Sequence, residues 1–204
     1  MMRSVFRMAP QRLTHRTRSR ARGLVRALAT ALLCSAPFTF GVAQAGSGEA
    51  GDLLMVIESS TFQLSVLDSR NGERSPTIRV ALGSPEQATP TGRFPLERII
   101  LSPSWRPGVV ATRAGAEPEA ASLDTPMGAV KIPFAADGVI ALHGGGDRRV
   151  LGKPISAGCV RATDADLLRV VAWLDRRDAL AAARRAQNGE FHRRFRRPIE
   201  LVVR

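Results

Sequence analysis

The stretch "ALHGGGDRRVLGKPISAGCVRATDADL", residues 141–167, contains a histidine, a glycine-rich segment and a cysteine in close succession. His143 ends the apolar run "GVIALH" (138–143), which predicts a buried strand that delivers the imidazole at its end. Cys159 follows sixteen residues later, and the intervening glycines allow the chain to fold back. The sequence therefore predicts a thiol and an imidazole that lie near each other.

A helix is predicted to start just after Cys159. Thr163 and Asp166 resemble a capping box, and the apolar residues that follow repeat at helical spacing. These apolar residues are Leu167, Val170, Val171 and Leu174. Further on, "RRDALAAARRAQNG" (176–189) predicts a second, polar-faced helix that ends at its Asn-Gly pair, within an expected helical insert over residues 175–197.

Short strands separated by turn formers make up much of the remaining chain. Besides the histidine strand, alternation and apolar runs predict strands at residues 52–58, 62–68, 77–82, 97–101 and 198–203. The "NG" pair (71–72) is favoured in tight hairpin turns, and the "PTG" corner (90–92) leads toward a further strand. Many strands, few helices and no strand-helix alternation argue against a parallel α/β sheet, so a mainly β domain is expected.

Residues 102–124 show no clean period and contain several prolines and glycines, which predicts a long loop or flap. Trp105 lies within this segment. Two interpretations stay open for its indole, which is either a packing anchor or part of a substrate-binding wall. The sequence alone favours simple burial, because large aromatic side chains bury well in most settings.

Residues 1–45 have the pattern of an export signal. Eight arginines and no acidic residue precede the uncharged run "ALATALLCSAPFTFGV" (27–42), and the small-residue site "AQAG" follows it. The run is shorter than the ~20 apolar residues that span a bilayer, and Pro37 interrupts it. We therefore expect removal of this segment, a short linker over residues 46–51 and one domain over residues 52–204, with no stable membrane span; a retained anchor is the alternative.

Removing that segment lowers the formal charge from +12 to +4, because 22 basic residues remain against 18 acidic ones. So small a surplus gives little support for a nucleic-acid-binding domain, although it is compatible with mild attraction to acidic cell-wall polymers. Cys34 leaves with the signal, so Cys159 has no partner for an intramolecular disulfide. The remaining thiol is either a reactive group or an inert buried one.

The chemistry expected of Cys159 depends on a neighbouring base. A thiol of pKa about 8.5 is mostly protonated at neutral pH, so it needs an imidazole or a cation beside it. His143 and His192 are the two histidines after residue 45, and the first is the closer partner in sequence. Gly158 leaves room for a substrate carbonyl to approach backbone N–H groups, and Arg161 either favours the thiolate, binds a substrate carboxylate or is simply solvated.

Three other interpretations of these residues have to be weighed. A buried structural cysteine beside a hydrogen-bonded His143 would need no chemistry, and the pair alone does not decide. The HGGG run (143–146) serves as an oxyanion loop in some lipases, but no G-x-S-x-G elbow accompanies it. One cysteine and two histidines lack the paired spacing of a zinc site, so no metal is expected.

A family resemblance bears on this choice. "HG" (143–144) followed by "SAGCVR" (156–161) resembles the signature of the YkuD-like L,D-transpeptidases, commonly written as HG followed by S-H-G-C-x-R. Further stretches agree with the resemblance: "TPTGRF" (89–94), "SPSWRP" (102–107) and "TPMGAVKI" (125–132). The resemblance covers roughly residues 52–174. It implies a mixed or antiparallel, sandwich-like β domain with one or two helices after the cysteine.

The resemblance also implies an activity and a set of roles. Cys159 would attack the carbonyl that joins a diamino acid to a terminal D-alanine in a peptidoglycan stem peptide, and an amine of a neighbouring stem would then attack the thioester. His143 would be the general acid and base, and the carbonyl of Gly144 would orient its ring. The oxyanion and substrate side would be formed by Ser156, Gly158, Arg161 and Trp105. Neither a metal nor a nucleotide is needed, because the thioester conserves the free energy of the acyl bond.

Two departures from the family pattern affect what is expected. Ala157 stands where the family usually has a second histidine. This leaves the expected base His143 in place but changes the shape and polarity of the site on the side where the acceptor would bind. Residues 175–197 are also longer than the expected link.

The expected function is therefore an exported L,D-transpeptidase, periplasmic or secreted, that acts on peptidoglycan stems. An outer-membrane or wall-attached lipoprotein is a further candidate partner. An L,D-carboxypeptidase or endopeptidase that uses the same thioester is one alternative. A non-catalytic wall-binding protein of the same fold is the other.

Overall fold

The computed structural model describes residues 52–204. The predicted export signal (1–45) and linker (46–51) lie outside these residues. Within the described part of the chain, no helix is both long enough and apolar enough to cross a membrane.

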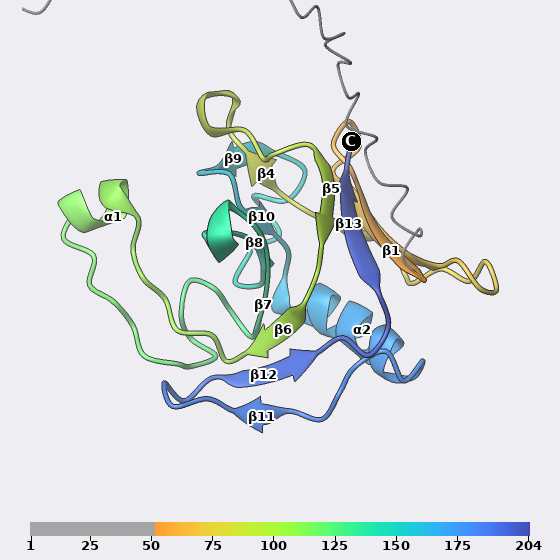
Figure 1. The fold of residues 1–204 in the computed structure, drawn as a ribbon. Coiled ribbons are helices and arrows are strands. Elements are labelled where there is room, and N and C mark those ends of the chain that lie inside the picture. Colours follow the sequence, from red (N-terminus) through yellow and green to blue (C-terminus); the bar gives the residue numbers. More distant parts are fainter. Residues whose placement is uncertain (1–51) are drawn as a thin grey trace, which may run out of the picture. The chain divides into compact units, whose positions relative to one another are not determined.

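Two β-sheets form the body of the domain (Figure 1). The first has the strand order β3-β2-β1-β13-β5, with the bounds β1 (Leu53–Glu58), β2 (Gln63–Asp68), β3 (Ile78–Arg79), β5 (Gly92–Pro95) and β13 (Ile199–Val203). Its pairs are antiparallel except for β1 and β13, which run parallel. Strand β13, near the C-terminus, therefore lies inside the sheet between β1, the first described strand, and β5.

The second sheet carries the histidine and the cysteine. Its order is β10-β8-β7-β6-β12-β11, with the bounds β6 (Arg98–Leu101), β7 (Val130–Ala135), β8 (Ile140–His143), β10 (Val160–Arg161), β11 (Arg184–Arg185) and β12 (Phe191–Arg194). A small parallel pair joins β4 (Leu82–Gly83) to β9 (Pro154–Ser156). The helical elements are α1 (Val109–Arg113), α2 (Asp164–Asp175) and the 3-10 turns η1 (Pro85–Gln87) and η2 (Ala136–Gly138).

The hydrophobic core lies between the two sheets and helix α2. Alternation along β1 buries Leu53, Met55 and Ile57 completely. Helix α2 contributes its apolar stripe, which consists of Leu167, Val170, Val171, Trp173 and Leu174. Leu142 of β8 belongs to the same core, and its neighbour His143 therefore points to the other face of the second sheet.

Most of the strands predicted from the sequence are confirmed. The runs at 52–58, 62–68, 97–101, 138–143 and 198–203 form β1, β2, β6, β8 and β13. The run at 77–82 is split into β3 and β4, because Ala81 pairs with Arg161 of β10 instead of continuing along β2. Residues 102–124 are mostly irregular, as predicted, and contain only the short helix α1.

The predicted start of the helix after the cysteine is also confirmed. Thr163 is the N-cap of α2, and its Oγ1 accepts the backbone N–H of Asp166 at 3.1 Å. This one helix follows Cys159, within the range of one or two helices that the sequence predicts.

The second helix predicted over residues 176–189 is wrong. The chain turns at Asp178, buries Ala179 and Leu180, and then runs beside β12, where Ala181 donates its N–H to the carbonyl of Arg194 at 2.9 Å. Its alanines favour a helix only weakly, and the segment has no apolar stripe to bury as a helix. Pairing with β12 satisfies the backbone instead, so the expected helical insert over residues 175–197 is a β-hairpin after the end of α2.

Candidate active site

His143 ends β8, and Cys159 lies just before β10, the neighbouring strand of the second sheet (Figure 1). Strand β10 runs parallel to β8, with Val160 opposite Leu142 and Arg161 opposite His143. Cys159 immediately precedes β10, so it lies one strand across from β8 and two positions before the level of His143. The sequence prediction that the histidine ends a strand is confirmed.

The spacing of the sheet sets the separation of the two residues. Neighbouring strands lie about 4.8 Å apart and each residue advances about 3.3 Å, which places the two Cα atoms roughly 8 Å from each other. In the structure the Sγ atom of Cys159 lies 3.7 Å from the carbonyl oxygen of Val139, just before β8 begins. The thiol is thus placed beside the strand that ends in His143.

A tight turn presents the thiol. The Oγ of Ser156 donates to the carbonyl oxygen of Cys159 and closes the segment 156–159. Gly158 has a φ of +98°, a left-handed conformation that favours glycine, and a Cβ there would meet the Cδ1 of Ile140 at 3.0 Å. Ala157 is exposed at the outside of this turn. Cys159 itself is half-buried.

His143 is buried, with an exposed fraction of 1%, and its ring is fixed by one hydrogen bond. The Nδ1 atom lies 2.8 Å from the carbonyl oxygen of Gly144. Because a carbonyl only accepts, Nδ1 carries the proton and Nε2 keeps its lone pair. Burial lowers the pKa of His143 to about 4, and the bond to Gly144 opposes this effect. At neutral pH the imidazole is therefore uncharged and able to accept a proton at Nε2.

Two cations flank the imidazole across the sheet. Arg161 is the partner of His143 on β10, and Lys131 is its partner on β7. The positive charges of both also lower the pKa of His143. Neither cation belongs to an ion pair within residues 52–204, so this side of the sheet carries positive charge beside the thiol.

Asp164 is a residue of this site that the sequence analysis missed. Its Oδ1 accepts the backbone N–H groups of Ala129 at 2.7 Å and Gly145 at 3.1 Å. An acid in the first turn of a helix resembles an ordinary favourable interaction with the helix dipole, so nothing singled it out. The signal available was the glycine run after His143, since consecutive glycines indicate that another group approaches the backbone closely.

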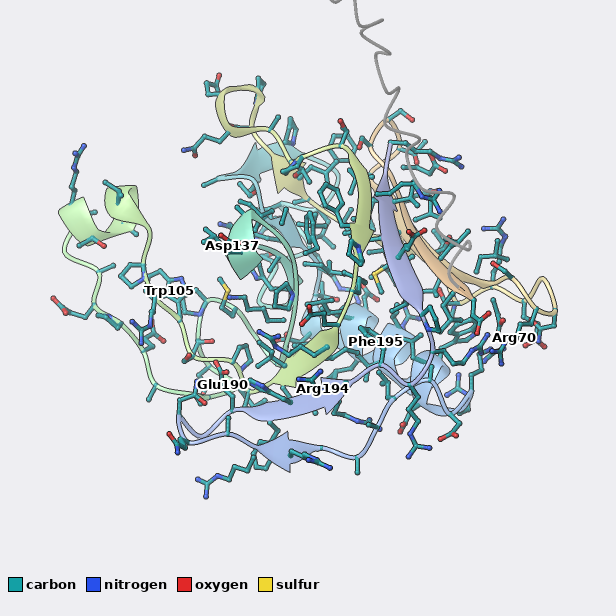
Figure 2. All side chains as sticks on the ribbon, viewed as in Figure 1. Arg70, Trp105, Asp137, Glu190, Arg194 and Phe195 are labelled. Carbon is teal, nitrogen blue, oxygen red and sulfur yellow. The ribbon has the colours of Figure 1, made fainter. Side chains whose placement is uncertain are left out.

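Trp105 lies on the loop that carries α1, between β6 and β7 (Figure 2). Its side chain is half-buried. Two backbone hydrogen bonds pair it with Glu119, at N···O distances of 3.0 and 2.9 Å. The two arms of the loop are thereby joined. The structure places Arg161 beside His143, and Ser156 and Gly158 in the turn that presents Cys159. Trp105 belongs to this separate loop.

The β11–β12 hairpin holds the base of the same loop through Glu190, labelled in Figure 2. Its Oε1 accepts the N–H and the Oγ–H of Ser104 at 2.9 and 2.7 Å, and its Oε2 lies 2.8 Å from Nε2 of His192. Burial acts to raise the pKa of Glu190, but the bonds from His192 and Ser104 outweigh it and hold the pKa at about 2. The carboxylate stays ionised at neutral pH.

A cavity of about 510 Å³ opens beside η2, next to Val139. Residues from β5 to β7 line it, including Pro95, Glu97, Arg98, Pro133 and Phe134. Within the described range 52–204, no three His, Cys, Asp or Glu side chains are grouped so that they could hold a metal ion.

Comparisons with known proteins agree with the signature found in the sequence. The family model of the L,D-transpeptidase catalytic domain matches residues 53–184. No curated protein sequence matches the chain. Among solved structures, the chain matches L,D-transpeptidase 3 from Mycobacterium tuberculosis with 14% identity and a TM-score of 0.47, covering 76% of this chain and 61% of that one.

It also matches an L,D-transpeptidase from Mycobacterium smegmatis with 15% identity and a TM-score of 0.42, covering 76% of this chain and 59% of that one. The chain thus spans about three fifths of the length of these structures. The family model covers well over half of the chain, including the histidine strand, the cysteine and helix α2. The chain belongs to the L,D-transpeptidase catalytic domain family.

Proposed function

We propose that this protein is an exported cysteine acyltransferase that forms or modifies peptidoglycan cross-links by L,D-transpeptidation through a thioester on Cys159. One observation carries the proposal. The sheet pairs the strand after Cys159 with the strand that ends in the buried His143, whose Nδ1 is occupied by the Gly144 carbonyl and whose Nε2 is free to exchange protons.

In the acylation half-reaction, Nε2 of His143 takes the proton of the Cys159 thiol. The Sγ atom then attacks the carbonyl carbon that joins the diamino acid of a stem peptide to its terminal D-alanine. Backbone N–H groups around Gly158 and Cys159 would stabilise the oxyanion that forms. The C–N bond breaks, the nitrogen of D-alanine takes the proton from His143, and a thioester remains.

In the second half-reaction an amine of a neighbouring stem attacks the thioester carbon. Nε2 of His143 takes the proton of that amine, the C–S bond breaks, and the proton returns to the sulfur. A new amide links the two stems. The reaction is balanced without a nucleotide or a redox partner, since one amide is exchanged for another.

The electrostatics of the site support this division of roles. The low pKa of His143 keeps it in the neutral form that accepts a proton from the thiol. The charges of Arg161 and Lys131 favour a thiolate and a substrate carboxylate on the same face of the sheet. Trp105 and the loop around it would form the outer wall of the substrate site.

Two alternatives use the same site. Water in place of the acceptor amine would make the protein an L,D-carboxypeptidase or endopeptidase. A wall-binding protein without catalysis is the second, and Ala157 on the exposed side of the turn is the observation that favours it, because the family has a histidine there. The partner in each case is a peptidoglycan stem peptide in the periplasm or outside the cell, with a wall-attached or outer-membrane lipoprotein as a further acceptor.

Mass spectrometry of the intact protein tests the proposal directly. The protein is incubated with a defined tetrapeptide stem, and we expect an adduct on Cys159 equal to the stem without its terminal D-alanine. His143→Gln should abolish the adduct, whereas the matched variant His192→Gln should retain it. Cys159→Ala that kept the wild-type product pattern would exclude every thioester scheme.

Product analysis then separates the alternatives. Purified sacculi incubated with the protein would show new cross-links for a transpeptidase, or trimmed stems for a carboxypeptidase or endopeptidase. Binding to sacculi that persists in Cys159→Ala, without any product from the wild type, would favour the wall-binding protein.

A further inference from the structure

We propose that Asp164 is a positioning residue for this reaction: its carboxylate holds the loop after β8 so that the ring of His143 stays in place through both proton transfers. The inference rests on the proposed function, because the position of the ring matters for turnover only if His143 moves protons. Asp164 would act through the backbone of Gly144 and Gly145.

The carboxylate joins two backbone segments that are far apart in the sequence. The Oδ1 of Asp164 accepts the N–H of Ala129, just before β7, at 2.7 Å. The same oxygen accepts the N–H of Gly145, just after β8, at 3.1 Å. One oxygen atom at the start of α2 therefore links the two segments that flank the paired strands β7 and β8.

Both contacts lead to Gly144, the residue that fixes the imidazole. Its carbonyl oxygen lies 2.8 Å from Nδ1 of His143, and its N–H donates to the carbonyl of Val130 at 2.9 Å. Ala129 precedes Val130 in the chain, and Gly145 follows Gly144. The peptide that orients the ring is thus restrained on both sides by groups that hydrogen-bond to Asp164.

The space around Asp164 gives an independent reason for the same conclusion. A Cβ atom on Gly144 would lie 1.9 Å from the Oδ1 of Asp164, and a Cβ on Gly128 would lie 2.3 Å from it. Both distances are far below van der Waals contact. At Gly128 a Cβ would also meet the backbone nitrogen of Gly145, at 2.2 Å, whereas at Gly144 the nearest atom is the Oδ1 of Asp164. The glycine after the histidine therefore leaves room for the approach of Asp164.

The charge of Asp164 also reaches the imidazole. The groups that act on His143 come from three elements: Lys131 on β7, Arg161 on β10 and Asp164 on α2. The two cations lower the pKa of His143, and the carboxylate raises it. Asp164 is the one acid among them, so its removal should make the imidazole a weaker base.

The start of α2 keeps the carboxylate in position. Thr163 caps the helix through Asp166, and Asp164 is its first residue. A negative charge is favoured at this end of a helix by the helix dipole. Because α2 is anchored in the core by its apolar stripe, the carboxylate is carried by one of the most firmly packed elements of the domain.

Two substitutions in the full chain separate geometry from charge. Asp164→Ala removes the acceptor, and we expect kcat on the tetrapeptide to fall about 100-fold with KM nearly unchanged, as for a misplaced catalytic group. Asp164→Asn keeps an Oδ1 acceptor but no charge, so it should recover most of kcat while lowering the pKa of His143. An NMR titration of the ring protons measures that pKa without any substrate.

The matched control is Asp166→Asn, two residues further along the same helix. The carboxylate of Asp166 pairs with Arg169 at 2.6 Å and lies outside the contacts made to the glycine loop. This variant should keep both the wild-type kcat and the wild-type pKa of His143. If Asp164→Ala does not fold, Asp164→Asn decides alone through its kcat, because a value as low as that of His143→Gln would contradict the positioning role.

The outcomes distinguish this inference from the proposed function. A wild-type kcat in a folded Asp164→Ala, or a kcat in Asp164→Asn no higher than in Asp164→Ala, would overturn the positioning role. An unchanged pKa of His143 in Asp164→Asn would overturn only the effect of the charge. If the wild type does not turn over stem peptides, the proposed function fails. The positioning role is then tested without substrate by alkylation of Cys159 with iodoacetamide, which should slow in Asp164→Ala and stay near the wild-type rate in Asp164→Asn.

Discussion

His143 shows how one side chain satisfies two requirements that oppose each other. The proposed proton transfer requires a ring that is held rigidly, which burial achieves, but burial also disfavours the charged form of the ring. The hydrogen bond to Gly144 restores part of the proton affinity and at the same time selects the tautomer. Because burial is the larger effect, the ring is neutral in the folded protein and charged only well below neutral pH.

This difference makes folding stability depend on pH through His143. An unfolded histidine binds a proton near pH 6.5, whereas the folded protein binds it near 4. Stability from this residue is fully present above pH 6.5 and is lost as the pH falls toward 4, by up to about 3 kcal/mol. We expect His143→Gln to remove most of this loss when urea unfolding is measured at pH 7, 6 and 5. In the control His192→Gln, a half-exposed histidine on β12, the loss should remain.

Ala157 is the residue at which the signature departs from the family, and its exposure makes it easy to exchange. Ala157→His adds a ring on the outside of the turn and should change the free energy of unfolding by less than about 0.5 kcal/mol, as exposed substitutions usually do. We expect acylation of Cys159 to persist, with a changed rate or a changed ratio of transfer to hydrolysis. Mass spectrometry of the adduct and of the products measures both. Loss of the adduct would mean that a side chain at position 157 blocks the approach of the stem peptide to Cys159, contrary to its placement on the outside of the turn.

At the scale of elements, the β11–β12 hairpin and the loop 102–124 form one unit. Glu190 in the hairpin accepts two hydrogen bonds from Ser104 at the base of the loop. The loop has few other anchors, which include its internal pairing at Trp105 and the bond from Thr125 to the carbonyl of Pro103. The hairpin therefore restrains the segment that carries the tryptophan of the proposed substrate wall.

Glu190→Ala tests this coupling. Losing hydrogen bonds to a buried carboxylate should cost about 1.5–3 kcal/mol each in the local opening of the loop. We expect trypsin to cut more rapidly after Arg113, which is exposed in the loop. The contribution of Glu190 is present above pH 4.5 and is lost as the pH falls toward 2, because its folded pKa is about 2. Limited proteolysis at pH 7 with mass detection of the fragments measures the effect.

Glu119→Ala is the matched control for that experiment. It removes an exposed carboxylate from the same loop but leaves the backbone pairing with Trp105 intact, because that pairing uses only main-chain atoms. Cleavage after Arg113 should proceed at the wild-type rate in this variant. Equal cleavage in Glu190→Ala and Glu119→Ala would mean that the hairpin does not restrain the loop.

The elements that were predictable from the sequence are those whose pattern is local. Strands β1 and β2 alternate clearly, and Thr163 marks the start of α2 by its own hydrogen-bonding capacity. The hairpin was not predictable, because its alanines and arginines carry a weak helical preference that pairing with β12 overrides. Asp164 was missed for a similar reason, since its partners Ala129 and Gly145 lie far away in the sequence.

At the scale of the whole domain, the described chain returns from the second sheet to the first through Arg197, between β12 and β13. Its guanidinium binds Asp68 at the end of β2 in a fork, with distances of 2.7 and 2.8 Å. The side chains are only 12% and 5% exposed, so the pair is nearly buried. The hydrogen bonds from Arg197 lower the pKa of Asp68 to about 2. This contact fixes the point at which β13 enters the first sheet beside β1.

Breaking this pair should destabilise the domain as a whole. Arg197→Met leaves the buried carboxylate of Asp68 without its guanidinium and with only the backbone N–H of Arg70 among its described donors, which we expect to cost about 3–5 kcal/mol in urea or thermal unfolding. The double variant Asp68→Leu with Arg197→Met should recover much of the loss, since an apolar pair needs no compensation. Removing the exposed pair by Glu58→Gln, which faces Arg204, should cost much less than Arg197→Met, because solvent screens an exposed ion pair.

The pH dependence of the same variants makes the assignment specific. Asp68 ionises near 3.8 when unfolded and near 2 when folded, so its contribution is present above pH 3.8 and is lost as the pH falls toward 2. Arg197→Met should therefore unfold with a smaller loss of stability between pH 4 and 2.5 than the wild type. If both proteins lose the same stability over that range, Arg197 does not set the ionisation of Asp68.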